Sequence, residues 1–142
     1  MYDTQQALIA HIDSVKDDLG ILTVKAYAGE FKDPTKLTNL KPAVFVMYID
    51  GGIDLVGGDF RFDLLVLVDS KTLSAQANAE NNLQLSQQIM DWIILHNQFS
   101  HLGKHYHIPN KYTDNHPPPQ ASTLLVDARY NIIAVHLSVI KY

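Results

Sequence analysis

The chain has 142 residues, a net charge of −4 at pH 7 and no cysteine. This length fits one domain, which can bury roughly 68–70% of the surface of its unfolded form. The acidic balance argues against a general nucleic-acid or membrane-surface binder. The lack of cysteine excludes disulfides, cysteine–zinc sites and thiol nucleophiles. No apolar run approaches the roughly 20 residues that span a bilayer, and the first residues lack signal-peptide features, so we expect a cytoplasmic protein.

An amphipathic helix is predicted over residues 4–19, because apolar side chains recur there three or four residues apart. These side chains are Leu8, Ile12, Val15 and Leu19. Asp3 with Gln6 resembles a capping box, and Gly20 suits the left-handed residue that commonly ends a helix. Residues 21–27 then predict a strand.

Two apolar runs of strand length, 42–50 and 60–69, follow at the centre of the chain. Both are rich in β-branched and aromatic residues. The second run sets Arg61 and Asp63 opposite apolar neighbours and becomes fully apolar over 64–68. The pattern predicts a central antiparallel pair whose ends are in water and whose middle is covered on both faces.

The connector between these runs, residues 51–58, is bracketed by two Gly-Gly pairs. A glycine-rich loop that cradles phosphate leads into a helix, whereas here a strand follows, so phosphate binding is disfavoured. The side chains at the tip are mainly apolar and unfavourable in water, so we expect them to become ordered against a neighbouring subunit. The residues of this expected interface are Ile53, Asp54, Leu55 and Val56.

A second, longer helix is predicted over residues 74–96. Its expected buried face consists of Ala79, Leu83, Met90 and Ile94, widened by Ile89, Trp92 and Ile93. Two strands with a turn near 128–131 are expected over 122–142. Together these elements predict a single α+β domain over 1–142, with a mixed or mostly antiparallel sheet of about five strands packed by two main helices.

Residues 97–121 predict a long loop that is rich in histidine. Four imidazoles could offer ligands to zinc or nickel, with Asp114 as a further candidate. They are those of His101, His105, His107 and His116. No carboxylate is obviously placed to orient them, which favours a solvated or interface loop, and no metal site is predicted.

One segment carries a resemblance to a known family. Tyr27-Ala-Gly-Glu-Phe-Lys-Asp-Pro34, Leu37, Leu40 and Pro42-Ala-Val-Phe-Val46 resemble the signature of a small tail protein of Mu-like phages and prophages. In that family an N-terminal helix leads to a strand that ends in aromatic-x-Gly-acidic-Phe. A Pro-Ala-Val strand, a helix and a C-terminal strand pair follow. The order of elements matches over essentially the whole chain, and the residues match over 27–46 and 60–69.

The resemblance implies a non-enzymatic tail terminator or tail completion protein without a cofactor. Such proteins form a ring, typically six-fold, on the head-proximal end of the tail tube, stop its growth and meet the head connector. The implied partners are other copies of the chain, tail tube and sheath proteins, and connector proteins. The implied location is the host cytoplasm and then the virion tail. No catalytic residue carries over; Gly29 is expected to permit a turn, Phe31 to fill the core and Pro42 to open a strand.

One enzyme class remains as an alternative. The order helix, three strands, helix, strand also occurs in the restriction-endonuclease-like fold, in which an acidic-x-Lys motif and a second carboxylate hold Mg²⁺. Asp69-Ser-Lys71 has this form, and the second carboxylate could come from Asp54, Asp59 or Asp63. Asp-Ser-Lys is equally common at the start of a helix. A metal-binding or adaptor module is the remaining alternative. The sequence contains no Gly-x-Ser-x-Gly motif, which excludes a hydrolase with that nucleophile elbow.

Overall fold

The computed structural model describes residues 1–32, 40–52, 57–68, 74–111, 117–127 and 130–142. Its helical elements are α1 (Tyr2–Asp13), α2 (Lys16–Leu19), α3 (Ala75–Leu95) and the 3₁₀ turn η1 (Glu30–Lys32). Its strands are β1 (Thr23–Ala26), β2 (Ala43–Gly52), β3 (Gly58–Leu67), β4 (Gln98–His101), β5 (Lys104–His107), β6 (Gln120–Asp127) and β7 (Tyr130–Lys141). The predicted α+β class is confirmed, with more strands than the expected five. No helix within these ranges has both the length and the apolar character to cross a membrane.

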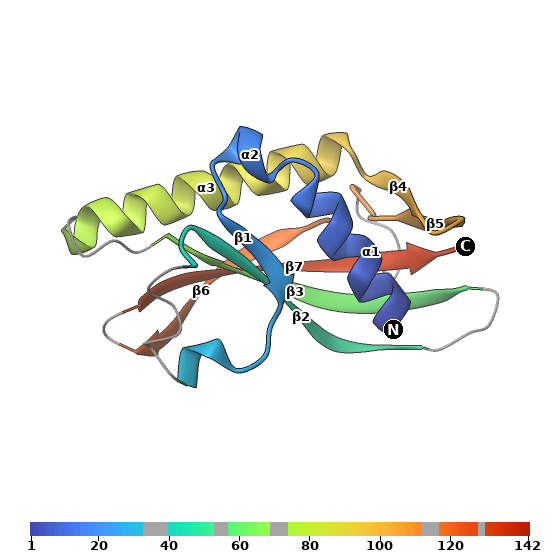
Figure 1. Ribbon diagram of the computed structural model, residues 1–142, viewed down its shortest axis with the longest axis horizontal. Coiled ribbons are helices and arrows are strands. Elements are labelled where there is room, and N and C mark those ends of the chain that lie inside the picture. Colours follow the sequence, from blue (N-terminus) through green and yellow to red (C-terminus); the bar gives the residue numbers. More distant parts are fainter. Residues whose placement is uncertain (33–39, 53–56, 69–73, 112–116, 128–129) are drawn as a thin grey trace.

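All of these strands belong to one mixed sheet in which β7 is the shared central strand (Figure 1). On one side of β7 the order is β3, β2, β1, and β1 is parallel to β2 while the other pairs are antiparallel. On its other side, β6 pairs with the first part of β7 and β5 with its end, where Tyr106 lies opposite Lys141. The predicted central antiparallel pair is therefore β2–β3.

One face of the sheet is covered by α1 and α3 (Figure 1). Alternate strand residues point into this layer, including Val44, Phe62, Leu64 and Val135, which are fully buried. The helices add Leu8, Ile12, Leu85, Ile89 and Ile93. Each such side chain contributes roughly 1.5–3 kcal/mol when it is removed from water. This layer is the main core of the protein.

Within the described ranges, the opposite face is covered over about half of its length, by the segment that follows β1. Gly29 has a φ of +86°, which glycine adopts without strain, and the chain turns there onto the sheet. The ring of Phe31 then packs 5.4 Å from that of Phe45 and 5.2 Å from that of Tyr27. The carbonyl of Pro42, just before β2, accepts the backbone N–H of Leu22 at 2.8 Å. The expected roles of Gly29, Phe31 and Pro42 in the fold are confirmed.

The N-terminal helix differs from its prediction in two ways. It is interrupted after Asp13, because the Ser14 hydroxyl donates to the carbonyl of His11 at 2.6 Å and the next turn tightens. The predicted capping box is absent, since α1 has Met1 as its N-cap with no side-chain bond, and Asp3 instead pairs with Lys104 at 3.7 Å. Gly20 does end α2 in the left-handed conformation, as expected.

The second helix has its predicted extent, and the Ser74 hydroxyl caps it by accepting the N–H of Ala77 at 3.1 Å. The predicted buried face was partly wrong. Ile89 and Ile93 are buried, but Leu83 is 62% exposed and Ile94 also faces solvent. The buried stripe includes two polar residues, Asn82 and Ser86, which the apolar pattern could not reveal.

The predicted long loop over 97–121 is wrong, because its first part forms the β4–β5 hairpin. The hairpin turns at Leu102 and Gly103, whose φ values are +50° and +78°. Such turns favour Asn-Gly or Asp-Gly, and a leucine in the left-handed region is uncommon, so the sequence carried no clear turn signal. The Phe99 and Tyr106 rings of the hairpin stack 5.4 Å apart and join the core beneath α1.

Candidate functional site

The uncovered half of the second face carries a row of polar side chains. Along β3 the residues on this face change from Leu67 and Leu65 to Asp63 and Arg61. On β7, Ala134 is buried and His136, two residues on, is exposed. The register pairs Asp63 directly with His136, so the change from apolar to polar occurs at one level across the sheet.

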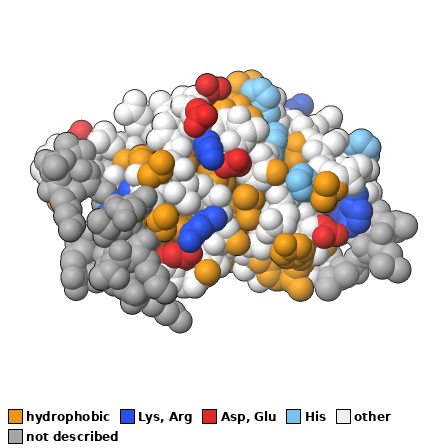
Figure 2. Space-filling view, in the orientation of Figure 1, with side chains coloured by type: hydrophobic (Ala, Val, Ile, Leu, Met, Phe, Trp, Pro, Cys, Tyr) orange, Lys and Arg blue, Asp and Glu red, His pale blue; other side chains and the backbone are white. Residues whose placement is uncertain are grey.

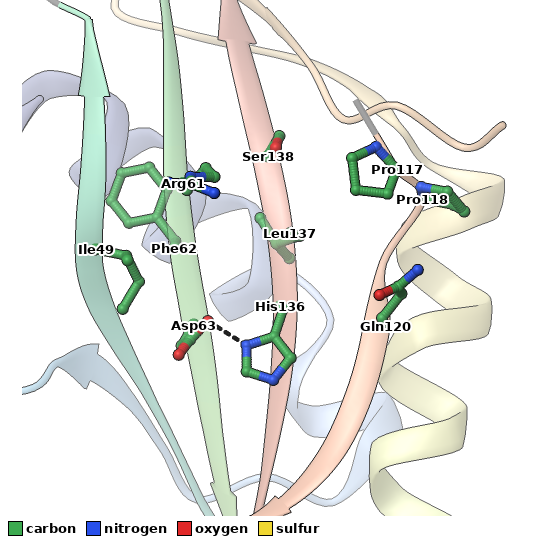
Figure 3. Close-up of a pocket in the computed structure, with 10 residues that line it drawn as sticks. All are labelled: Ile49, Arg61, Phe62, Asp63, Pro117, Pro118, Gln120, His136, Leu137 and Ser138. Atoms are coloured by element: carbon green, nitrogen blue, oxygen red, sulfur yellow. Dashed lines mark hydrogen bonds and ion pairs between the residues drawn. The ribbon is translucent and has the colours of Figure 1, made fainter. Parts of the chain in front are cut away.

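Hydrogen bonds join Asp63 and His136 of this row to Ser122 on β6, and Figure 3 shows the bond between Asp63 and His136. His136 Nδ1 lies 2.6 Å from Asp63 Oδ1, and His136 Nε2 lies 2.6 Å from the hydroxyl of Ser122 on β6. A carboxylate only accepts, so Nδ1–H donates to Asp63, and in the neutral imidazole Nε2 accepts from Ser122. Beside this row, Arg61 forms a two-pronged ion pair with Asp50 on β2. Its guanidinium holds the pKa of the Asp50 carboxyl below the usual range.

A recess of about 300 Å³ opens beside the polar row (Figure 3). Its walls come from β2, β3, β7 and the proline segment before β6, and include Ile49, Arg61, Asp63, Pro117, Gln120 and His136. It is bounded by both charged and apolar groups, with the exposed imidazole between them. This half of the face therefore combines polar and apolar groups around a recess that is open to water.

The order Asp63–His136–Ser122 has the connectivity of a nucleophile, its base and an orienting carboxylate. Acyl transfer also needs donors aimed at the developing oxyanion, and removing one such donor costs about 10²–10³ in rate. Backbone N–H groups of strands lie in the plane of the sheet, whereas these side chains stand perpendicular to it. The guanidinium of Arg61 is held by Asp50. We call this row of cross-strand polar contacts, Asp63–His136–Ser122, the polar ladder.

Sequence reasoning anticipated Arg61 and Asp63 on a wet strand end but missed the ladder. The alternation of side chains over 132–140 predicts a half-buried His136, whereas its side chain is exposed. The sequence signal that could have revealed the ladder is the alternation in β3 and β7, where polar residues recur at every second position. Which polar residues meet depends on the register, and no local pattern specifies the register of strands 73 residues apart.

The histidines weighed as metal ligands are separated by the β4–β5 hairpin. His101 lies opposite Lys104, while His105 and His107 occupy the other face of β5. His105 Nδ1 is 2.8 Å from the Ser100 hydroxyl, and no group of three or more metal-ligating side chains occurs in the described part of the chain. His116 and Asp114 lie outside the described residues. Figure 2 shows several histidine side chains on this face of the molecule.

Two other sets of predicted residues fall largely outside the described ranges. The expected interface residues Ile53, Asp54, Leu55 and Val56 do so, as do Asp69 and Lys71 of the nuclease alternative. Their flanks are described: β2 ends at Gly52 and β3 begins at Gly58, so the connector does join an antiparallel pair. Of the other candidate carboxylates, Asp63 is engaged by His136.

A second cluster joins α1, α3 and β4 on the helical side. The His11 ring stacks on Phe99 at 4.2 Å and tilts against Trp92 at 4.6 Å. Its Nε2 donates to the backbone carbonyl of His96 at 2.7 Å. Burial lowers the pKa of His11. The hydrogen bond to the His96 carbonyl opposes this shift, and the charge of the nearby His96 imidazole adds to it. His11 falls beside the apolar stripe of the predicted helix, where a boundary residue is expected, and the structure places it there as a half-buried link between the two helices.

Comparison of the chain with protein-family models and with curated proteins finds no match.

Proposed function

We propose that this chain is a structural tail protein of a Mu-like phage or prophage, a tail terminator. Copies of it form a ring, six-fold like the typical rings of that family, at the head-proximal end of the tail tube. The ring stops tube growth and presents a surface to the head connector. Its other partners are the tube and sheath proteins, and it performs no catalysis.

The observation that carries this proposal is the structural unit formed by the two matching segments. Glu30 accepts the N–H of Ala28 at 2.7 Å and pairs with Lys25 Nζ at 3.0 Å. This turn brings Phe31 onto Phe45, which belongs to the Pro-Ala-Val strand. The residues that carry the resemblance thus contact one another and cover half of a sheet face. Their chemistry is used for folding, which agrees with a family in which no catalytic residue is expected.

The arrangement of elements also supports the proposal. An N-terminal helix, a strand with the aromatic-x-Gly-acidic-Phe turn, the Pro-Ala-Val strand, a later helix and a C-terminal strand pair occur as α1, β1, β2, α3 and β6–β7. Among the described strands, β1 and β6 each pair with one neighbour only, and a subunit with such edges is suited to assembly.

The first test is the mass of the protein in solution. Light scattering during size-exclusion chromatography is expected to find a ring-sized species, or a monomer that assembles as the concentration rises. The same measurement is repeated with purified tube protein from the same phage. A strict monomer at every concentration, with and without tube protein, contradicts the proposal.

A further inference from the structure

The strand β6 lies at an open edge of the sheet. Among the described strands it pairs with β7 alone. Its residues Ala121, Ser122, Thr123 and Leu124 are all exposed, so neither face of this part of the strand is covered. The sequence from 120 to 126 contains no charge and no proline. Edge strands of soluble proteins are usually protected by charges, proline, bulges or a covering segment, because their backbone groups otherwise pair with another chain.

The opposite end of the sheet has matching properties. There β1 pairs with β2 alone among the described strands. Its only charged residue, Lys25, forms an ion pair with Glu30, with 3.0 Å between Nζ and Oε1. Leu22, directly before β1, is 57% exposed, and Leu124 on β6 is 38% exposed. Each edge therefore carries an apolar side chain that a second strand would cover.

The strand directions of the two ends are complementary. Because β2 and β7 are both antiparallel to β3, they run the same way, and β1 runs with them. β6 runs in the opposite direction. If copies join side by side with their strands in one orientation, β1 of one copy lies antiparallel to β6 of the next. An antiparallel pair forms perpendicular hydrogen bonds and needs no crossover connection.

We propose that β6 of each copy pairs antiparallel with β1 of its neighbour, so that the sheets continue head to tail around the ring. This inference rests on the proposed ring. A heterologous contact of this kind closes into a ring when its rotation permits, and then both β1 and β6 are paired in every copy. β6 ends in Asp127, next to an irregularity in its pairing with β7, so any protection of this edge lies at that end of the strand. Ring closure would explain how the uncharged stretch 120–126 is tolerated. A two-fold dimer through β6 alone would leave β1 open.

The absence of cysteine allows a direct test with single-cysteine variants. Thr23, Ser122 and Leu124 lie on the same face of the sheet, whereas Ala121 and Thr123 lie on the other, as their partners in β2 and β7 show. Thr23→Cys is mixed with each of four β6 variants: Ala121→Cys, Ser122→Cys, Thr123→Cys and Leu124→Cys. The mixtures are oxidised at concentrations where the wild type assembles. A disulfide needs Cα atoms about 4.4–6.8 Å apart and Cβ atoms that face each other.

The expected result is a mixed disulfide with the variant at 122 or 124, at least fivefold more than with those at 121 and 123. Assembly of the wild type without this alternation overturns the β6–β1 contact and leaves the ring proposal standing. Homodimers of the β6 variants that form in preference to the mixed disulfide also overturn it, in favour of a two-fold contact. If the wild type does not assemble even with tube protein, the ring proposal fails together with this one.

Discussion

The carboxylate of Glu30 lies between the backbone N–H of Ala28, at 2.7 Å, and the Nζ of Lys25, at 3.0 Å, with only 5% of its side chain exposed. This relationship holds the turn that places Phe31 on the sheet. Burial alone would raise the pKa of Glu30. The hydrogen bond from Ala28 and the interaction with Lys25 outweigh it and leave the pKa lowered from its ordinary value of 4.5.

This predicts a specific dependence of stability on pH. A carboxyl whose pKa is lower in the folded state stabilises the protein above its unfolded pKa, and the effect is lost as the pH falls through the folded value. We expect Glu30→Gln to reduce the free energy of unfolding at pH 7 by about 1.5–3 kcal/mol. Urea titrations should show the difference from the wild type shrinking below about pH 4.5. A difference that is constant down to pH 3 would show that the charge of Glu30 contributes nothing.

His11 is a base, whereas Glu30 is an acid, but it too is expected to make the protein less stable as the pH falls. Because burial lowers the pKa of His11 from 6.5, the unfolded chain binds its proton more readily, and stability is lost as the pH falls below about 6.5. His11→Phe keeps a ring between Phe99 and Trp92 without a proton to bind. The variant's thermal midpoint should therefore fall less than that of the wild type between pH 7.5 and 5.5. Parallel curves would rule out His11 as the source.

The buried face of α3 can be checked with a matched pair of substitutions. Ile89 is fully buried, whereas Leu83 is 62% exposed on the same helix. Ile89→Ala should lower the free energy of unfolding by about 2–5 kcal/mol, because it leaves a cavity in the core. Leu83→Ala should change it by less than about 0.5 kcal/mol. Equal losses in the two variants, measured by chemical denaturation, would mean that the helix buries the face first predicted from its apolar pattern.

The α3 case shows what the sequence could and could not predict. Strands β2 and β3 were predictable because their period-two patterns are long and their middles are apolar on both faces. The Tyr27–Phe31 turn was predictable because glycine and an aromatic residue have narrow roles there. The buried face of α3 was not predictable from an apolar pattern because it includes the polar residues Asn82 and Ser86. The β4–β5 hairpin was not predictable because Leu102–Gly103 is not a usual turn sequence. The polar ladder depends on pairing between distant strands, which local patterns do not encode.

The assignment of the Asp63–His136–Ser122 row as a ladder predicts an absence of chemistry. A fluorophosphonate probe, which labels activated serines, should leave Ser122 unmodified, with mass spectrometry as the readout and a serine hydrolase as the positive control. Plasmid DNA with Mg²⁺ or Mn²⁺ should stay intact. Labelling that disappears in Ser122→Ala would make the row a catalytic site. Cleavage that disappears in Asp69→Ala would favour the nuclease alternative.

The edge pairing predicts that one charge on β6 blocks assembly. Thr123 is exposed on the open strand, so a lysine there should be tolerated by the monomer and should repel or desolvate a pairing strand. We expect Thr123→Lys to shift the light-scattering mass toward the monomer, while Thr123→Val assembles like the wild type. Both should unfold at nearly the same temperature when monomeric. Normal assembly of Thr123→Lys would exclude β6 from the interface.

The measurement that tests the central claim most directly is the length of tail tubes grown in vitro from purified tube protein and viewed by electron microscopy. The account predicts that this chain, added at far fewer copies than the tube protein, stops growth and leaves a ring on one end of each tube. Thr123→Lys should leave growth unrestrained. Tubes of unchanged length with bare ends, in the presence of assembled wild-type protein, would contradict the assignment as a tail terminator.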